Sequence, residues 1–197
     1  MKQSILFVLL LLISTNIQAA ADAVAGKNKS AVCATCHGAD GNSINPVWPS
    51  LAGQSQGYLA KQLKNFRDGI RKNMTMSPMA AALTDQDIAD LAAYYTSLNA
   101  KAGTTKEKYV ELGSKIYSGG VTGVLACTAC HGPNGDGLDA AGFPKISGQK
   151  VQYVIMQLNN FKNGSRSSSA NSMMNDIAAK MNDEQIEAIA NYLAGLH

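Results

Sequence analysis

The sequence predicts an all-α protein built from two tandem copies of one small helical domain. Three observations lead to this fold class. The string C-x-x-C-H occurs twice, at residues 33–37 and 127–131. Residues after each copy match one another at offsets of 94 to 98, which is typical of a duplicated domain. Apolar residues recur at the spacing of a helix face, and no credible run alternates between apolar and polar residues as a strand would.

Residues 1–20 predict a secretory signal peptide. Lys2 supplies a positive charge, residues 5–13 form an unbroken apolar core of nine residues, and small residues follow at 19–21. Nine apolar residues are too few to span a bilayer, which needs about 20. An uncleaved anchor is the alternative. Since no other segment is apolar enough to cross a membrane, we expect a periplasmic protein, exported by this signal, with no transmembrane segment in the mature chain.

The first domain is predicted at residues 21–98. An Ala-rich segment leads into the first C-x-x-C-H string, and a middle helix follows at about residues 58–67 and stops near Gly69. The last helix begins after Thr84, which is a good N-cap with acidic residues in the next turn. Its apolar residues share one helix face, and these are Ile88, Leu91, Ala92, Tyr95 and Leu98.

Residues 99–105 are the predicted linker, since their composition suits an exposed connection. The second domain, residues 106–197, repeats the first. A leading helix is expected at residues 107–117, a middle helix at about 151–162, and a last helix after Asn182. The apolar face of the last helix recurs at the same spacing, as Ile186, Ile189, Ala190, Leu193 and Leu196.

Each C-x-x-C-H string is the pattern by which haem c is attached covalently. Its two thiols bond to the vinyl groups of the porphyrin, and the adjacent histidine gives a nitrogen to the iron. The residues concerned are Cys33, Cys36 and His37 in the first copy and Cys127, Cys130 and His131 in the second. All four cysteines of the chain are used in this way. We therefore predict two covalently bound haem c groups, which would also supply apolar bulk to two small cores.

Three other uses of these cysteines are weaker. Structural zinc ligand pairs usually lie closer together in the sequence, and zinc gives no reason for a histidine after each pair. A thioredoxin-like pair belongs to a βαβ pattern, which is not found here, and would not occur twice. Two disulfides are possible in an exported chain, but they would need no histidines.

The sixth ligand of each iron is predicted from the repeat. Met76 lies eight residues before the Thr84 cap, and Met174 lies eight residues before Asn182. They alone match each other among the methionines near these positions, whereas Met74, Met79, Met173 and Met181 each face a different residue type. His197 has no counterpart in the first half. A methionine ligand raises the reduction potential and occupies the sixth coordination position of the iron, which favours electron transfer over catalysis.

The chain carries a formal net charge of +3, and its basic residues are dispersed. A nucleic-acid-binding surface would instead need a basic cluster, so no nucleic-acid partner is expected. The adjacent pair Arg71 and Lys72 is interpreted as part of a solvated loop.

The whole mature chain resembles the cytochrome c4 family, dihaem proteins built from two class I cytochrome c domains. The matching residues are 32–43, 51–54 and 85–94 in the first half and 141–144, 148–149, 177–180 and 195–197 in the second. The resemblance implies that His37 and Met76 ligate one iron, and His131 and Met174 the other. It also implies that the carbonyls of Pro49 and Pro144 accept hydrogen bonds from these imidazoles. Trp48 and Phe143, which precede the prolines, are expected to pack against haem.

These observations predict an electron carrier, not an enzyme. It would shuttle electrons from a quinol-oxidising complex or a dehydrogenase to a terminal oxidase, and its halves would pack through faces near the haems. One alternative is a dihaem redox enzyme of the peroxidase or thiosulfate-oxidising type. Such an enzyme needs an iron whose sixth coordination position can become vacant, or a special His or Cys ligand, and the chain has no spare cysteine. Another is an electron-accepting subunit bound to a dehydrogenase.

Overall fold

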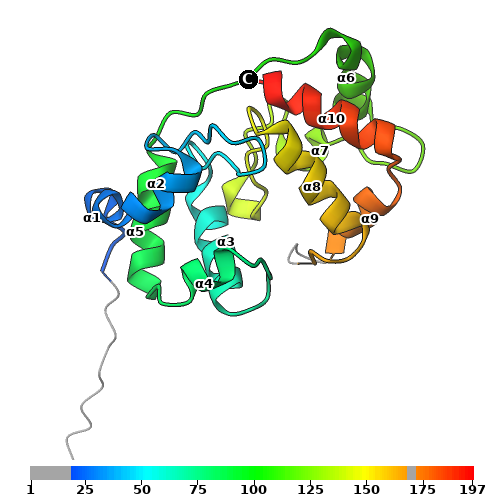
Figure 1. The fold of residues 1–197 in the computed structure, drawn as a ribbon. Coiled ribbons are helices and arrows are strands. Elements are labelled where there is room, and N and C mark those ends of the chain that lie inside the picture. The colour runs from blue at the N-terminus through cyan, green and yellow to red at the C-terminus, as the bar shows by residue number, and fades with distance from the viewer. Residues whose placement is uncertain (1–18, 168–171) are drawn as a thin grey trace, which may run out of the picture.

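The computed structural model describes residues 19–167 and 172–197, so most of the predicted signal peptide lies outside it. Within these ranges the chain forms helices and loops and no β-strand, which confirms the all-α prediction. The chain folds into two lobes, one from each half of the sequence (Figure 1).

The first lobe contains α-helices of 5 to 12 residues. They are α1 (Ala23–Lys29), α2 (Ala31–His37), α3 (Gln56–Arg67), α4 (Met76–Ala80) and α5 (Asp85–Thr96). The middle and last helices, α3 and α5, lie where the sequence predicts them. The shorter α4 was not predicted, because a segment of 5 residues has too few turns to show an apolar period.

The second lobe repeats this order with two additional 3₁₀ turns. Its elements are η1 (Glu107–Tyr109), α6 (Val110–Gly119), α7 (Thr128–His131), η2 (Asp139–Ala141), α8 (Val151–Lys162), α9 (Met173–Ala179) and α10 (Asp183–Gly195). The expectation of three helices per half was therefore too low, and the short helices α7 and α9 account for the difference here.

Capping boxes start the last helix of each half at the predicted residues. The Thr84 hydroxyl accepts a hydrogen bond from the Asp87 N–H at 3.1 Å, and the Asp87 carboxylate accepts one from the Thr84 N–H at 2.9 Å. Asn182 and Gln185 exchange the equivalent pair at 2.8 and 3.0 Å. These bonds satisfy N–H groups that a helix start leaves without partners.

Each half has its own hydrophobic core, which is the physical basis for two domains. In the first half the predicted face of α5 is buried, and the cluster includes Leu91, Tyr95 and Leu59 of α3. In the second half the face of α10 forms the equivalent cluster, with Ile186 and Ile189 no more than 2% exposed.

In each half a glycine lets the first α-helix cross the last one closely, α1 against α5 and α6 against α10. A Cβ added to Gly26 of α1 would overlap the backbone of Asp90 in α5. A Cβ added to Gly113 of α6 would overlap Tyr192 of α10 and lie 2.9 Å from the Ala188 carbonyl oxygen. Both crossings therefore require a residue without a side chain.

The segment between α5 and η1 passes from one lobe to the other (Figure 1) and bonds to both. The Lys101 ammonium lies 2.6 Å from the Asp40 carboxylate of the first half. The Gly103 N–H donates to the Ala194 carbonyl of the second half at 2.8 Å. The linker predicted at residues 99–105 lies within this segment, and its boundaries remain a prediction.

Candidate haem sites and the interface between them

Each C-x-x-C-H string lies on a short helix that ends at its histidine. Cys33 and Cys36 are three residues apart on α2, so their thiols lie on one side of the helix, and Cys127 and Cys130 have the same relation at α7. The helices stop because Gly38 and Gly132 adopt φ angles of +85° and +77°, a region that other residues rarely enter.

The four cysteines are all free, so the two-disulfide alternative does not hold. In the described part of the chain, no group of three or more His, Cys, Asp or Glu side chains is placed to hold a metal ion. Burial raises the pKa of the Cys127 thiol to about 11, so this thiol is protonated at neutral pH until it reacts.

Both histidines are buried and held by a backbone carbonyl. The His37 Nδ1–H donates to the Pro49 carbonyl oxygen at 2.8 Å, and the His131 Nδ1–H donates to that of Pro144 at 2.9 Å. This arrangement places the free lone pair on Nε2, where an iron would bind, and confirms the hydrogen bonds that the family resemblance implies. Burial lowers the pKa of both imidazoles, so each is neutral at pH 7, as a metal ligand must be.

The methionines differ in exposure in a way that supports the predicted choice in the first half. Met74 is 97% exposed and Met79 is 41% exposed, whereas Met76, the first residue of α4, is half-buried. The Asn73 side chain accepts a hydrogen bond from the Met76 N–H at 2.8 Å and so orders the start of this helix. In the second half Met174 lies on α9 and packs against the core.

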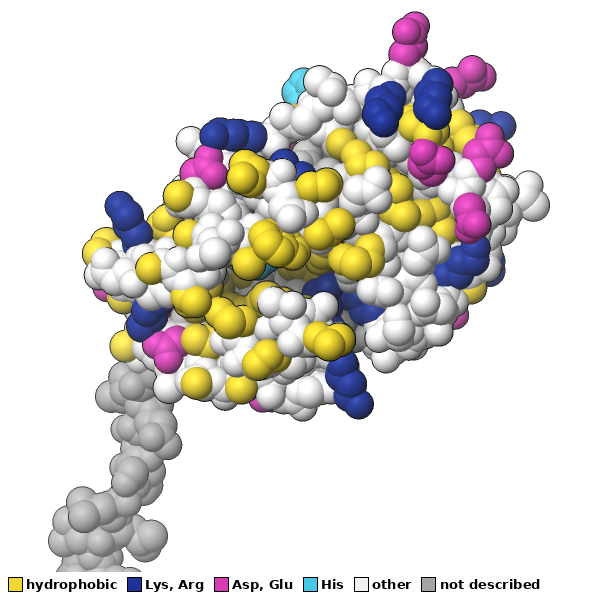
Figure 2. Space-filling model, in the orientation of Figure 1, with side chains coloured by type: hydrophobic (Ala, Val, Ile, Leu, Met, Phe, Trp, Pro, Cys, Tyr) yellow, Lys and Arg dark blue, Asp and Glu magenta, His cyan; other side chains and the backbone are white. Residues whose placement is uncertain are grey.

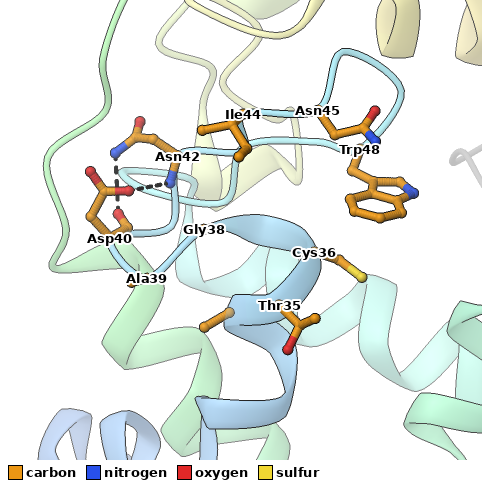
Figure 3. Close-up of a pocket in the computed structure, with 10 residues that line it drawn as sticks. Thr35, Cys36, Gly38, Ala39, Asp40, Asn42, Ile44, Asn45 and Trp48 are labelled. Carbon is orange, nitrogen blue, oxygen red and sulfur yellow. Dashed lines mark hydrogen bonds between the residues drawn. The ribbon is translucent and has the colours of Figure 1, made fainter.

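An open hollow of about 400 Å³ lies beside Cys36, between α2 and the loop that follows it (Figure 3). Ile44, 97% exposed, and Trp48, 37% exposed, lie at its edge. The one carboxylate that lines it belongs to Asp40, whose pKa falls to about 2 because Lys101 and the Asn42 N–H donate hydrogen bonds to it. This carboxylate therefore ties the loop together and is not suited to general acid catalysis.

The two halves meet through a symmetrical polar network that the sequence interpretation missed. Arg71 donates to the Tyr153 hydroxyl at 3.2 Å and to the Gln157 amide oxygen at 2.8 Å. Arg166 donates to the Tyr58 hydroxyl at 2.9 Å and to the Gln62 amide oxygen at 3.3 Å. Arg71 thus lies at the interface between the halves, and its interpretation as part of a solvated loop was wrong.

These interface residues left a signal in the sequence. Tyr58, Gln62 and Arg71 each match the same residue type 95 positions later. Polar residues that persist in a duplicated chain point to a shared role, but only the structure shows that each set bonds to the other half.

Arg166 also shows that the chain suits an anionic cofactor. It is 8% exposed, its Nε atom has no hydrogen-bond partner among the described residues, and its other bonds go to two amide oxygens and a tyrosine hydroxyl, with no carboxylate among them. A buried guanidinium without a negative partner is costly, and haem carries two propionates that would compensate this charge. In addition, hydrophobic side chains gather around a hollow in the left and central part of Figure 2, and a histidine is visible within it.

Comparison with known proteins agrees with this geometry. The cytochrome c family model matches the chain twice, over residues 23–99 and 110–197. Cytochrome c4 of Azotobacter vinelandii is 43% identical over an alignment that covers 100% of both chains. The crystal structure of reduced recombinant cytochrome c4 from Pseudomonas stutzeri superposes with a TM-score of 0.87 at 43% identity, covering 90% of this chain and 100% of that one.

One similar protein carries a more specific functional name. A thiosulfate dehydrogenase electron acceptor of Stutzerimonas stutzeri strain A1501 is 39% identical, covering 87% of this chain and 82% of its own length.

Two cytochrome c domains and two cysteine pairs in this chain fit two covalent haem c groups.

Proposed function

Since this chain belongs to the cytochrome c4 family of dihaem electron-transfer proteins, we propose that it is a mobile carrier that takes electrons from a quinol-oxidising complex or a dehydrogenase and delivers them to a terminal oxidase. We further propose that residues 1–20 export it to the periplasm and that residues 99–105 connect its domains. No helix in the described residues is long and apolar enough to span a membrane.

The observation that carries this proposal is the presence of two equivalent sites, each with a buried, neutral imidazole. A haem bound at each site would supply one-electron redox chemistry. Cys33 and Cys36 would attach one haem and Cys127 and Cys130 the other. His37 and Met76 would ligate one iron, and His131 and Met174 would ligate the other.

The other side chains around these sites support transport in preference to catalysis. Pro49 and Pro144 accept hydrogen bonds at 2.8 and 2.9 Å that hold the two imidazoles in one orientation, which limits structural change when the charge on the iron changes. The open hollow beside Cys36 offers no acid that could donate a proton near neutral pH, because the carboxylate of Asp40 is already engaged. We therefore assign no catalytic residues.

Covalent attachment makes a direct prediction for the purified holoprotein. Acid–acetone extraction should leave the colour with the protein, because thioether bonds do not break under these conditions. The mass should exceed that of the mature chain by two haems. Extractable haem, or a mass increase of one haem, would contradict the proposal.

A mobile carrier should exchange electrons with membranes but not react with small ligands. The reduced protein should be oxidised readily by membranes that contain a terminal oxidase. It should show little spectral change under carbon monoxide near neutral pH, because the gas must first displace a methionine. Rapid turnover of peroxide, or a high-spin iron in the resting protein, would favour the enzyme alternative.

A second candidate function follows from the relative that is named as an acceptor for thiosulfate dehydrogenase. In that case the chain would stay bound to one dehydrogenase and would not diffuse between complexes. Pull-down from native membranes distinguishes the two. A stable stoichiometric dehydrogenase, together with no oxidation by any membrane oxidase, would favour the bound subunit.

A further inference from the structure

A matched pair of glutamine side chains, one from each half, forms hydrogen bonds across the interface. The Gln149 Oε1 accepts a hydrogen bond from the Ser50 N–H at 2.9 Å, and its Nε2 donates to the Ser50 carbonyl at 3.0 Å. In the opposite direction, Gln54 Oε1 accepts from the Lys145 N–H at 2.8 Å, and its Nε2 donates to the Lys145 carbonyl at 2.8 Å. Each amide therefore bonds to both backbone polar groups of one residue in the other half.

The residues held in this way directly follow the prolines that bond to the histidines. The Pro49 carbonyl and the Ser50 N–H belong to the same peptide group. Its oxygen accepts from the His37 Nδ1–H at 2.8 Å, while its N–H donates to Gln149 at 2.9 Å. A continuous chain of hydrogen bonds thus runs from a glutamine of the second half to an imidazole of the first.

The same chain exists in the other direction. The peptide group between Pro144 and Lys145 accepts from the His131 Nδ1–H at 2.9 Å and donates to Gln54 at 2.8 Å. Two copies of this arrangement, at equivalent positions of a duplicated chain, make an accidental contact an unsatisfactory explanation.

Each glutamine amide also accepts a hydrogen bond from its own half, which orients it toward the other half. Gln54 Oε1 also accepts from the Ser55 N–H at 3.0 Å, and Gln149 Oε1 also accepts from the Lys150 N–H at 2.9 Å. Because two N–H groups donate to each of these atoms, both must be oxygens, which settles which way the amide points. Gln54 is 7% exposed, so little water competes for its bonds.

We propose that each glutamine is a positioning residue for the iron ligand of the other half: Gln149 acts on His37, and Gln54 acts on His131. An acceptor on the peptide N–H polarises the peptide group and makes its carbonyl oxygen a stronger acceptor. The stronger bond to Nδ1 gives the imidazole more electron density, which stabilises ferric iron and lowers the reduction potential. Domain packing thereby contributes to both potentials. The inference rests on the proposed function, which assigns these histidines to iron.

The test is a crossed pair of variants of the holoprotein, Gln149→Met and Gln54→Met. Potentials are measured by optical redox titration, and each haem is assigned by NMR contacts between its methyl groups and residues of its own half. Gln149→Met should raise the potential of the first-half haem, changing its redox equilibrium constant about twofold to tenfold, where tenfold is about 59 mV for one electron. The redox equilibrium constant of the second-half haem should change less than twofold. Gln54→Met should give the reverse pattern.

Two further variants separate positioning from simple adhesion between the halves. Asp139→Ala removes another contact across the interface, from the Gly57 N–H to the Asp139 carboxylate at 3.4 Å, that touches neither proline peptide. It should leave unchanged which haem has the higher potential, and neither redox equilibrium constant should change more than twofold. Gln149→Glu keeps an oxygen toward Ser50 and should lower the first-half potential, opposite to Gln149→Met.

Shifts confined to the haem of the substituted half would overturn the inference. Equal shifts of both haems, or none, would do the same. Failure of the proposed function is visible separately, since a wild-type protein without low-spin His/Met spectra would show it before any variant is made.

Discussion

Replacing Met76 with Ala, or Met174 with Ala, should remove about half of the weak near-infrared band that a methionine sulfur gives to ferric haem. Each substitution takes the sulfur from one of two sites, and alanine cannot reach the iron. The potential of the affected haem should fall, because methionine stabilises the ferrous state relative to harder ligands such as water. The reduced variant should also bind carbon monoxide at that site. Absorption spectra of the oxidised and the carbon-monoxide-treated reduced protein measure both effects.

Met74→Ala provides the matched control for the first half. Met74 lies two residues from Met76 but is 97% exposed, so its loss should leave the near-infrared band and the response to carbon monoxide unchanged. If Met74→Ala removes half of the band and Met76→Ala does not, the correspondence drawn between the two ligand loops is wrong.

Gly113→Ala should lower the free energy of unfolding of the second domain by about 3 kcal/mol, the upper part of the usual range for overpacking. The added methyl group would overlap Tyr192 and lie 2.9 Å from the Ala188 carbonyl oxygen, so α6 and α10 must move apart. Their separation would also disturb the cluster that includes Ile116 and Ile189. Urea unfolding of the holoprotein, followed by absorbance of the haem, measures the change.

Gly119→Ala is the control, because it lies on the same helix and an added Cβ would meet no atom within 4 Å. It should stabilise the domain by up to about 1 kcal/mol, since alanine restricts the unfolded chain more than glycine does. Equal destabilisation by both substitutions would show that helix α6 is sensitive to any change and that the close crossing is not the cause.

The sequence alone was sufficient to predict the chemistry of the cofactor sites and the architecture. Cys33, Cys36 and His37 form a local motif, whose meaning depends on adjacent residues and not on the fold. Thr84 and Asn182 are local signals too, because a capping box needs only residues within one turn. The repeat then predicted two domains, since the C-x-x-C-H string, the middle helix and the last helix of the first half all reappear in the second half at nearly constant spacing.

The tertiary structure decided how the two domains contact each other. Arg71 and Gln149 are polar residues in loops or near helix starts, where sequence patterns carry little information about partners. Their hydrogen bonds join residues separated by up to 99 positions, as from Gln149 to Ser50. Such contacts depend on how two finished surfaces fit together. A duplicated sequence therefore reveals that polar residues were retained in pairs, and only the packed interface reveals that each pair is exchanged between the halves.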